Sequence, residues 1–231
     1  MAEVVAKRSK RYKESTKTAV QQAVQLDQAI DVVKSFKPTK FDQSVELIFN
    51  LGIDAKQADQ IVRGSVSLPH GIGKSKRVIC FCPEHLKIAA MNAGALKAGG
   101  QELVAEVEKD NFTDFDVAIA TPDMMRFVGR LGKVLGPKGL MPSPKAGTVT
   151  VDVGTAVREY AAGKVEFRND AGGNLHTVVG KVSFEKNQLA ENVTAMIAQV
   201  RRLKPQTSKG AYLKKVVLKA TMSPAVQLVI A

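Results

Sequence analysis

The pattern of apolar and polar positions divides the chain into three blocks, and the first block mixes helical spacing with strand spacing. Apolar residues recur every three or four positions over 26–36, which predicts an amphipathic helix. Apolar and polar residues alternate over 41–49 and again over 62–68, which predicts two strands that each have one buried face. The first block therefore predicts a sheet with a helix packed on it.

The middle block has a different rhythm. Unbroken apolar runs over 78–82 and 117–120 predict strands buried on both faces, which are typical of parallel sheets. A helix is predicted over 84–96, and a short strand over 102–107 follows the break at Gly99-Gly100. This order of elements predicts a small α/β layer with a largely parallel sheet.

A capped helix and a loop without acidic residues follow. Thr121-Pro122-Asp123 is typical of a helix start, and Gly136-Pro137 is typical of a helix end. Met124–Val151 contains no Asp or Glu, and its loop carries the basic residues Lys133, Lys138 and Lys145. Free backbone N–H groups without local negative charge favour a phosphate-bearing partner. The alternative is a solvated loop with a chance run of lysines.

The first rhythm returns after residue 151. Proline- and glycine-rich joints stand at both changes of rhythm, so one domain inserted into another is the simplest interpretation. We expect an outer α+β domain made of residues 1–69 plus 158–231, and an inserted α/β domain made of residues 70–157. The elements predicted for the last block are a helix over 157–162, strands over 165–168 and 176–184 joined by a turn, a helix over 189–203, and strands over 214–221 and 226–230.

The basic charge of the chain gathers in one of these domains. The net charge is +12. Residues 70–157 hold 11 basic and 9 acidic side chains, whereas the rest of the chain holds 23 basic and 13 acidic ones. This asymmetry favours a polyanion-binding face on the outer domain. Diffuse charge that only aids solubility is the alternative.

The N-terminal segment is also basic. It is either a flexible arm that binds phosphates or a solubilising tail, and its basic residues are Lys7, Arg8, Lys10, Arg11, Lys13 and Lys17. It lacks the apolar stretch of a signal peptide, and the chain has no apolar run long enough to span a bilayer. We therefore expect a cytoplasmic protein without a membrane partner.

Candidate catalytic and metal-binding residues are few. Cys80 and Cys82 lie on one predicted strand near His85, but a zinc site would need further ligands, so buried thiols are expected. Gly73-Lys74-Ser75 is similar to the end of a phosphate loop, but the motif needs a glycine where Leu68 stands. We therefore expect no metal, no cofactor and no enzymatic activity. A nucleotide-dependent enzyme remains an alternative reading.

Seven phrases in the right order resemble the ribosomal protein L-one family of the bacterial type. The resemblance runs from about residue 10 to residue 230. The phrases are KFD at 40–42, LGID at 51–54, VRGSVSLPHGIGK at 62–74, DFDVAIATPDMM at 114–125, LGKVLGPKGLMPSPKAGTV at 131–149, VEFRND at 165–170 and TMSP at 221–224.

The resemblance implies an architecture and a function. The inserted domain would be a three-layer, Rossmann-like α/β domain, and the hinge would use Leu68, Pro69, Gly71 and Arg158. The first domain would bind large-subunit rRNA and form the mobile lateral stalk of the ribosome. The protein would assist release of exit-site tRNA, repress translation of its own mRNA and be a monomer when free. A DNA- or mRNA-binding regulator outside the ribosome is the alternative.

The resemblance also implies which residues contact RNA. Phe41 and Met222 would lie against ribose and base surfaces, and the polar groups of Thr221, Asn169 and Ser183 would bond to 2′-hydroxyls and phosphates. The implied rRNA-binding residues are Lys40, Phe41, Glu46, Arg168, Asn169, His176, Lys181, Ser183, Thr221, Met222 and Ser223, with Lys133, Lys138 and Lys145 as accessory contacts.

Some of these positions have a structural alternative. The family usually has glycine where Ser223 stands, so this serine either crowds the RNA or adds a hydroxyl bond to it. Phe41 could belong to the core, and Glu46 or Arg168 could form an ordinary cross-strand ion pair. Replacing both Thr221 and Met222 by alanine is expected to weaken rRNA binding and to leave the fold intact.

Overall fold

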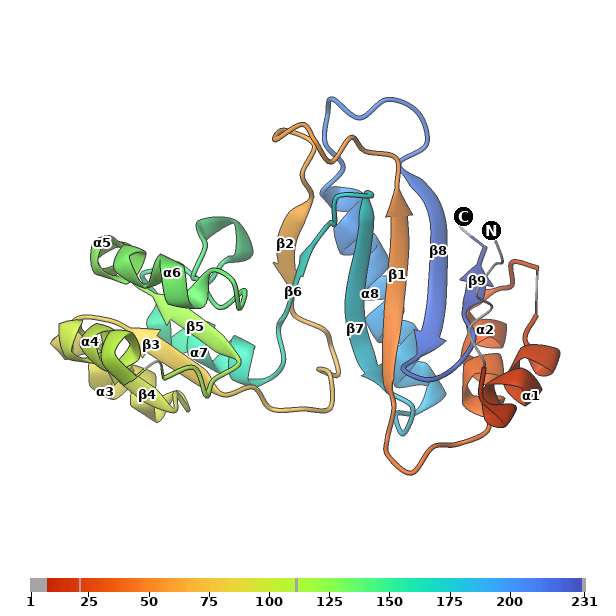
Figure 1. Cartoon of the computed structure of the whole chain (residues 1–231), viewed down its shortest axis with the longest axis horizontal. Coiled ribbons are helices and arrows are strands. Elements are labelled where there is room, and N and C mark those ends of the chain that lie inside the picture. The colour runs from red at the N-terminus through yellow and green to blue at the C-terminus, as the bar shows by residue number, and fades with distance from the viewer. Residues whose placement is uncertain (1–7, 21, 111, 230–231) are drawn as a thin grey trace, which may run out of the picture. The chain divides into compact units, whose positions relative to one another are not determined.

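The computed structural model describes residues 8–20, 22–110 and 112–229, which form two compact units (Figure 1). Unit 1 combines both chain ends and is built from residues 8–62, 68–70 and 168–229. Unit 2 is built from Arg63–Ser67 and Gly71–Phe167. Antiparallel strands form the larger sheet and parallel strands form a smaller one, which confirms the predicted α/β class with two domains.

Unit 1 is organised around a four-stranded sheet in the order β7-β1-β8-β9. The three pairings within it are antiparallel. The strands are β1 (Ser44–Leu51), β7 (Asn174–Lys181), β8 (Leu213–Ala220) and β9 (Val226–Leu228). Each corresponds to a predicted strand with shifted ends, and residue 230 of the last predicted strand lies outside the described residues.

Two helices pack against this sheet, because each presents an apolar stripe to it. They are α2 (Leu26–Ser35) and α8 (Lys186–Arg202), and both match predicted helices. Along β1, every second residue is buried, so the intervening residues Ser44, Glu46, Ile48 and Asn50 lie on the opposite face. The polar side chains of Ser44, Glu46 and Asn50 therefore lie on the face of β1 that points away from the core.

Part of the predicted N-terminal arm is a helix, α1 (Lys10–Thr18). The helix begins after Ser9, whose Oγ accepts a hydrogen bond from the backbone N–H of Tyr12 at 3.2 Å. The interpretation of this segment as a flexible arm is therefore wrong for residues 10–18. Residues 1–7, including Lys7, lie outside the described residues.

Unit 2 has three layers around a parallel sheet in the order β4-β3-β5. Alternate residues of β3 face opposite layers: Ile79 and Phe81 pack into one core cluster, and Val78 and Cys80 pack into the other. This arrangement confirms the predicted three-layer, Rossmann-like unit. Its elements are β3 (Val78–Phe81), α3 (Glu84–Asn92), β4 (Lys97–Gly99), α4 (Gln101–Asp110), β5 (Val117–Ala120) and α7 (Val153–Ala161).

The strand predicted over 102–107 is wrong, because these residues belong to the helix α4. Leu103, Val104 and Val107 are buried against the sheet, and this spacing fits one face of a helix. The second strand is instead β4, which ends at Gly99, the first residue of the glycine pair that was expected to be a break.

The helix predicted from residue 121 is broken into short turns. These are η1 (Pro122–Met124), α5 (Met125–Val128), η2 (Gly129–Leu131) and α6 (Gly132–Leu135), followed after a loop by η3 (Pro144–Ala146). Gly129 and Gly132 stand at the breaks, and glycine lowers helix propensity. Thr121 stands at the N-cap, but its hydroxyl has no hydrogen-bond partner among the described residues.

The chain passes between the units along β2 (Arg63–Val66) and β6 (Val165–Arg168), which pair with each other. Leu68 is buried, and Gly71 has a φ of 61°, which favours glycine. Arg158 lies inside α7, and its carbonyl accepts from the N–H of Ala162 at 2.9 Å. Arg158 therefore lies in a hydrogen-bonded helix interior, and the hinge role expected for it remains a prediction.

Candidate nucleic-acid interface

Three connections meet at one end of the unit 1 sheet. Ser44 at the start of β1 lies opposite Lys181 at the end of β7, and Val45 lies opposite Ala220 at the end of β8. The loop before β1, the segment after β7 and the turn after β8 are therefore neighbours. They carry the predicted residues Lys40, Phe41, Lys181, Ser183, Thr221, Met222 and Ser223.

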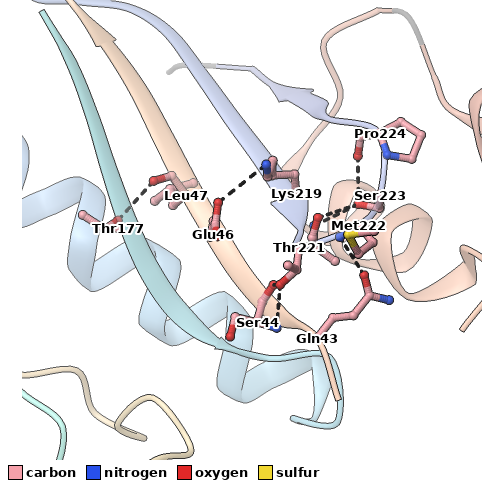
Figure 2. A network of polar contacts seen from close by, with 11 residues as sticks. Gln43, Ser44, Glu46, Leu47, Thr177, Lys219, Thr221, Met222, Ser223 and Pro224 are labelled. Atoms are coloured by element: carbon pink, nitrogen blue, oxygen red, sulfur yellow. Dashed lines mark hydrogen bonds and ion pairs between the residues drawn. The ribbon is translucent and has the colours of Figure 1, made fainter. Parts of the chain in front are cut away.

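The turn after β8 is held by the hydroxyl of Ser223 (Figure 2). This Oγ accepts from the N–H of Ala220 at 2.9 Å and lies 2.9 Å from the carbonyl oxygen of Pro224, to which it donates. Ser223 is only 8% exposed, whereas Met222 is 49% exposed. The serine hydroxyl thus bonds within the turn and fixes the position from which Met222 reaches solvent.

The hydroxyl of Thr221 is used within the sheet. Thr221 Oγ1 accepts from the N–H of Ser44 at 3.1 Å and lies 3.2 Å from the carbonyl oxygen of Ser44. Glu46 pairs across the strands with Lys219, with 3.7 Å between the carboxylate oxygen and Nζ. The cross-strand ion pair considered for Glu46 is therefore present, and Lys219 is its cation.

The loop before β1 exposes an aromatic ring. Phe41 is 54% exposed, so the alternative that places it in the core is wrong. The neighbouring Asp42 holds the loop in place, because its carboxylate accepts from the N–H and Oγ–H of Ser183 at 3.2 and 2.8 Å. Lys181 Nζ donates to Ser44 Oγ at 3.1 Å. Lys40 is exposed beside Phe41.

The structure does not bring Arg168, Asn169 and His176 to this end of the sheet. His176 pairs with Ile48, further along β1, and Asn169 forms a bridge with Leu175 near the start of β7. His176 and Arg168 are exposed, but Asn169 is only 7% exposed.

Asn169 and its neighbour Asp170 both bond to the chain itself. The Asn169 side chain accepts from the N–H of Val62 at 2.8 Å and donates to the carbonyl of Asp170. A direct bond from Asn169 to RNA is therefore unsupported. Asp170 accepts from the N–H of Gly172 and of Asn174 at 2.9 and 2.7 Å, and the hydrogen bond from the Asn174 backbone lowers the pKa of this carboxyl.

The acid-free loop of unit 2 is ordered by side-chain bonds to its backbone. Thr148 Oγ1 accepts from the N–H of Ser143 at 2.8 Å, and the buried Tyr160 donates its hydroxyl hydrogen to the carbonyl of Ala146 at 2.6 Å. Burial of the Tyr160 hydroxyl raises its pKa above the ordinary value for tyrosine. The predicted accessory residues are all exposed in or beside this loop: Lys133, Lys138 and Lys145.

Sequence reasoning missed Gln43, which ties the loop that carries Phe41 to the turn that carries Met222. Gln43 is buried, and its Oε1 accepts from the N–H of Met222 at 2.9 Å (Figure 2). The sequence contained a signal for this role, because Gln43 is two residues before Val45 and so falls on the buried side of β1. A polar residue on the buried side of a strand requires a hydrogen-bond partner.

The two cysteines lie in the core of unit 2. Cys80 and Cys82 are free and fully buried, which confirms that they are core thiols. Within the described ranges, no group of three or more His, Cys, Asp or Glu side chains could hold a metal ion. The same ranges contain no helix that combines the length and the apolar character needed to cross a membrane.

Comparison with known proteins identifies the family. Residues 33–224 match the model of the "Ribosomal protein L1p/L10e family". The chain is 49% identical to the large ribosomal subunit protein uL1 of Kosmotoga olearia, over 96% of each chain. It is 48% identical to uL1 of Mycoplasma capricolum, over 97% of this chain and 99% of that one, and 48% identical to uL1 of Cutibacterium acnes, over 96% of each. The chain belongs to the ribosomal protein L1p/L10e family.

Proposed function

We propose that unit 1 binds large-subunit rRNA through one surface at the end of its sheet. We call this the sheet-end surface and define it by Lys40, Phe41, Lys181, Ser183, Lys219 and Met222. The observation that carries the proposal is the exposure of Phe41 and Met222 among lysines, on loops held by Asp42 and Gln43. Aromatic and thioether side chains are normally buried, so their exposure on fixed loops indicates a binding surface.

The chemistry of this surface fits RNA. Lysine ammonium groups supply salt-dependent affinity for phosphates. An exposed ring and a thioether can lie against unstacked bases or riboses, and hydroxyl groups can bond to the 2′-hydroxyl that distinguishes RNA from DNA. Binding is led by the shape of a folded RNA, because the deep groove of an A-form helix hides most base edges.

The family and the relatives named uL1 support a role as a structural constituent of the large ribosomal subunit in the cytoplasm, and not as an enzyme. In this role the protein forms the mobile lateral stalk with rRNA and assists release of exit-site tRNA. Unit 2 adds contacts through Lys133, Lys138 and Lys145. The same unit 1 surface binds the protein's own mRNA and represses its translation.

Competition binding tests the proposal. A labelled lateral-stalk rRNA fragment is bound to the full chain and competed with unlabelled fragment or with duplex DNA of equal length. The RNA is expected to compete at far lower concentration. Phe41→Ala is expected to weaken RNA binding about tenfold, since base–aromatic stacking contributes ~1–3 kcal/mol. The matched control is Ile88→Ala, which removes an apolar side chain of unit 2 that is even more exposed than Phe41.

The alternative is a DNA- or mRNA-binding regulator outside the ribosome. Equal competition by DNA and RNA would favour a DNA-binding regulator and contradict the rRNA proposal. Tight binding to the protein's own mRNA leader, without binding to the rRNA fragment, would favour regulation alone. A nucleotide-dependent enzyme is disfavoured by Glu102, whose carboxylate accepts from the N–H of Gly100 beside β4 and repels phosphate there.

A further inference from the structure

A groove runs between α1 and the β8–β9 edge of unit 1. It consists of two adjoining hollows of about 470 and 340 Å³, which share Tyr12 and Ala225 in their walls. The larger hollow is lined on one side by Arg8, Arg11 and Tyr12 and on the other by Lys219, Thr221 and Met222. The smaller one continues along β8 past Lys215 and Val217 and reaches Gln227 of β9. The groove therefore starts at Met222 of the sheet-end surface.

The helix that forms one wall is anchored in place. Ser15 of α1 is buried, and Glu14 pairs with Lys37 at 3.0 Å between Oε2 and Nζ. The guanidinium of Arg8 lies over the ring of Tyr12, 4.8 Å from its centroid. The wall thus presents an aromatic ring and two arginines from fixed positions, rather than from an unfolded tail.

The lining has the charge of an anion site. Four cations line the two hollows, namely Arg8, Arg11, Lys215 and Lys219, and no described residue in either lining is acidic. Glu46 of β1 pairs with Lys219 at 3.7 Å but is not part of either lining. A ligand in the groove therefore meets excess positive charge, together with the hydroxyls of Ser9 and Thr221.

The shape and the apolar groups narrow the ligand class further. A hollow of this size admits one or two unstacked nucleotides but not a double helix. Tyr12 and Met222 supply apolar surfaces for a base, and the arginines supply donors for the flanking phosphates. This combination of aromatic and cationic side chains along a groove is how proteins bind single-stranded nucleic acid.

We propose that the groove between α1 and the β8–β9 edge binds a short single-stranded RNA segment, with a base against Tyr12 and its phosphates on Arg8, Arg11 and Lys219. The inference rests on the proposed function and extends it, because it adds an unpaired strand to the folded RNA bound at the sheet-end surface. The N-terminal helix is then part of the RNA site.

The experiment uses the full chain and two probes, the lateral-stalk rRNA fragment and a ten-nucleotide oligouridylate. Arg11→Ala is expected to weaken oligouridylate binding and to lower the slope of log K against log salt by roughly 0.7, the value for one phosphate contact on a single strand. Tyr12→Leu is expected to weaken it about tenfold through loss of stacking. Lys13→Ala removes the same charge from an exposed position outside both linings and is expected to change binding less than twofold.

Photocrosslinking supplies a readout that does not depend on folding of the variants. Oligouridylate carrying 4-thiouridine is irradiated with the wild-type chain, and an adduct on Tyr12, which lies outside the sheet-end surface, is expected. Adducts only at other positions, no measurable oligouridylate binding, or equal losses for Arg11→Ala and Lys13→Ala would overturn the inference. If the wild type binds the rRNA fragment in these cases, the proposed function stands without the groove. If the wild type fails to bind the rRNA fragment at all, the proposed function itself is wrong.

Discussion

Thr221 holds Ser44 through both its backbone and its side chain, although 177 residues separate them. The N–H of Thr221 donates to the Ser44 carbonyl at 3.0 Å, and the Thr221 hydroxyl accepts from the Ser44 N–H at 3.1 Å. The threonine therefore closes the end of the β1–β8 ladder. The Thr221→Ala, Met222→Ala double variant loses the hydroxyl bond of this closure but keeps the backbone bond, so the expectation that its fold stays intact remains a prediction.

Thr221→Val is expected to lower the free energy of unfolding by about 1 kcal/mol, since it leaves the Ser44 N–H without its hydroxyl acceptor. Urea unfolding monitored by circular dichroism measures the change. Thr221→Ser keeps the hydroxyl and serves as the control. Equal stability of the valine variant and the wild type would show that water replaces the hydroxyl without cost.

Met222→Ala separates RNA contact from stability. Met222 is 49% exposed, and its backbone N–H, not its side chain, bonds to Gln43. We expect rRNA affinity to fall several-fold and the urea midpoint to stay within error, because surface substitutions away from packing cost little. Met91→Ala, in unit 2 and 46% exposed, is the matched control for loss of an exposed methionine. Unchanged RNA affinity in Met222→Ala would remove this residue from the proposed surface.

Asn169→Ala is expected to act on stability first. The buried amide accepts from the Val62 N–H, and its removal leaves that donor unpaired, at a cost of about 1–3 kcal/mol. Differential scanning calorimetry of the variant measures the loss. Arg168→Ala, at the exposed neighbouring position, is expected to leave the melting temperature nearly unchanged. A stable Asn169→Ala protein with reduced RNA affinity would instead restore the direct RNA contact.

Asp170 is expected to make unfolding more sensitive to acid. Hydrogen bonds from Asn174 and Gly172 lower the pKa of this carboxyl below its ordinary value of 3.8. The folded state therefore binds a proton less readily than the unfolded state. The resulting stabilisation is fully present above the ordinary pKa and is lost as the pH falls through the lower folded value.

Urea midpoints measured between pH 2.5 and pH 7, the range that brackets the ordinary carboxyl pKa, test this. The wild type is expected to lose part of its stability at the acid end, and Asp170→Asn is expected to lose less over the same range. Asp59→Asn, at another exposed turn, controls for the general loss of a carboxylate. Parallel acid profiles of the wild type and Asp170→Asn would contradict the role of Asp170.

Several elements followed from local periodicity. The alternation of β1 and the unbroken apolar runs of β3 and β5 predict strands, because side chains alternate between the two faces of a sheet. The prediction of a strand over 102–107 failed, because a short apolar run fits a strand and a helix equally well. Only its packing against the sheet of unit 2 decides between them.

The sequence by itself determined the three blocks and the concentration of basic charge in the two chain ends, because composition and periodicity are local properties. Its resemblance to the family supplied the candidate residues Phe41 and Met222. Only the tertiary structure decided which polar side chains remain available to a ligand. Folding brings the Ser44 and Val62 N–H groups to Thr221 and Asn169 from distant parts of the chain, whereas Ser223 bonds within its own turn. The groove beside α1 has the same origin, since its walls come from opposite ends of the chain and meet only after folding.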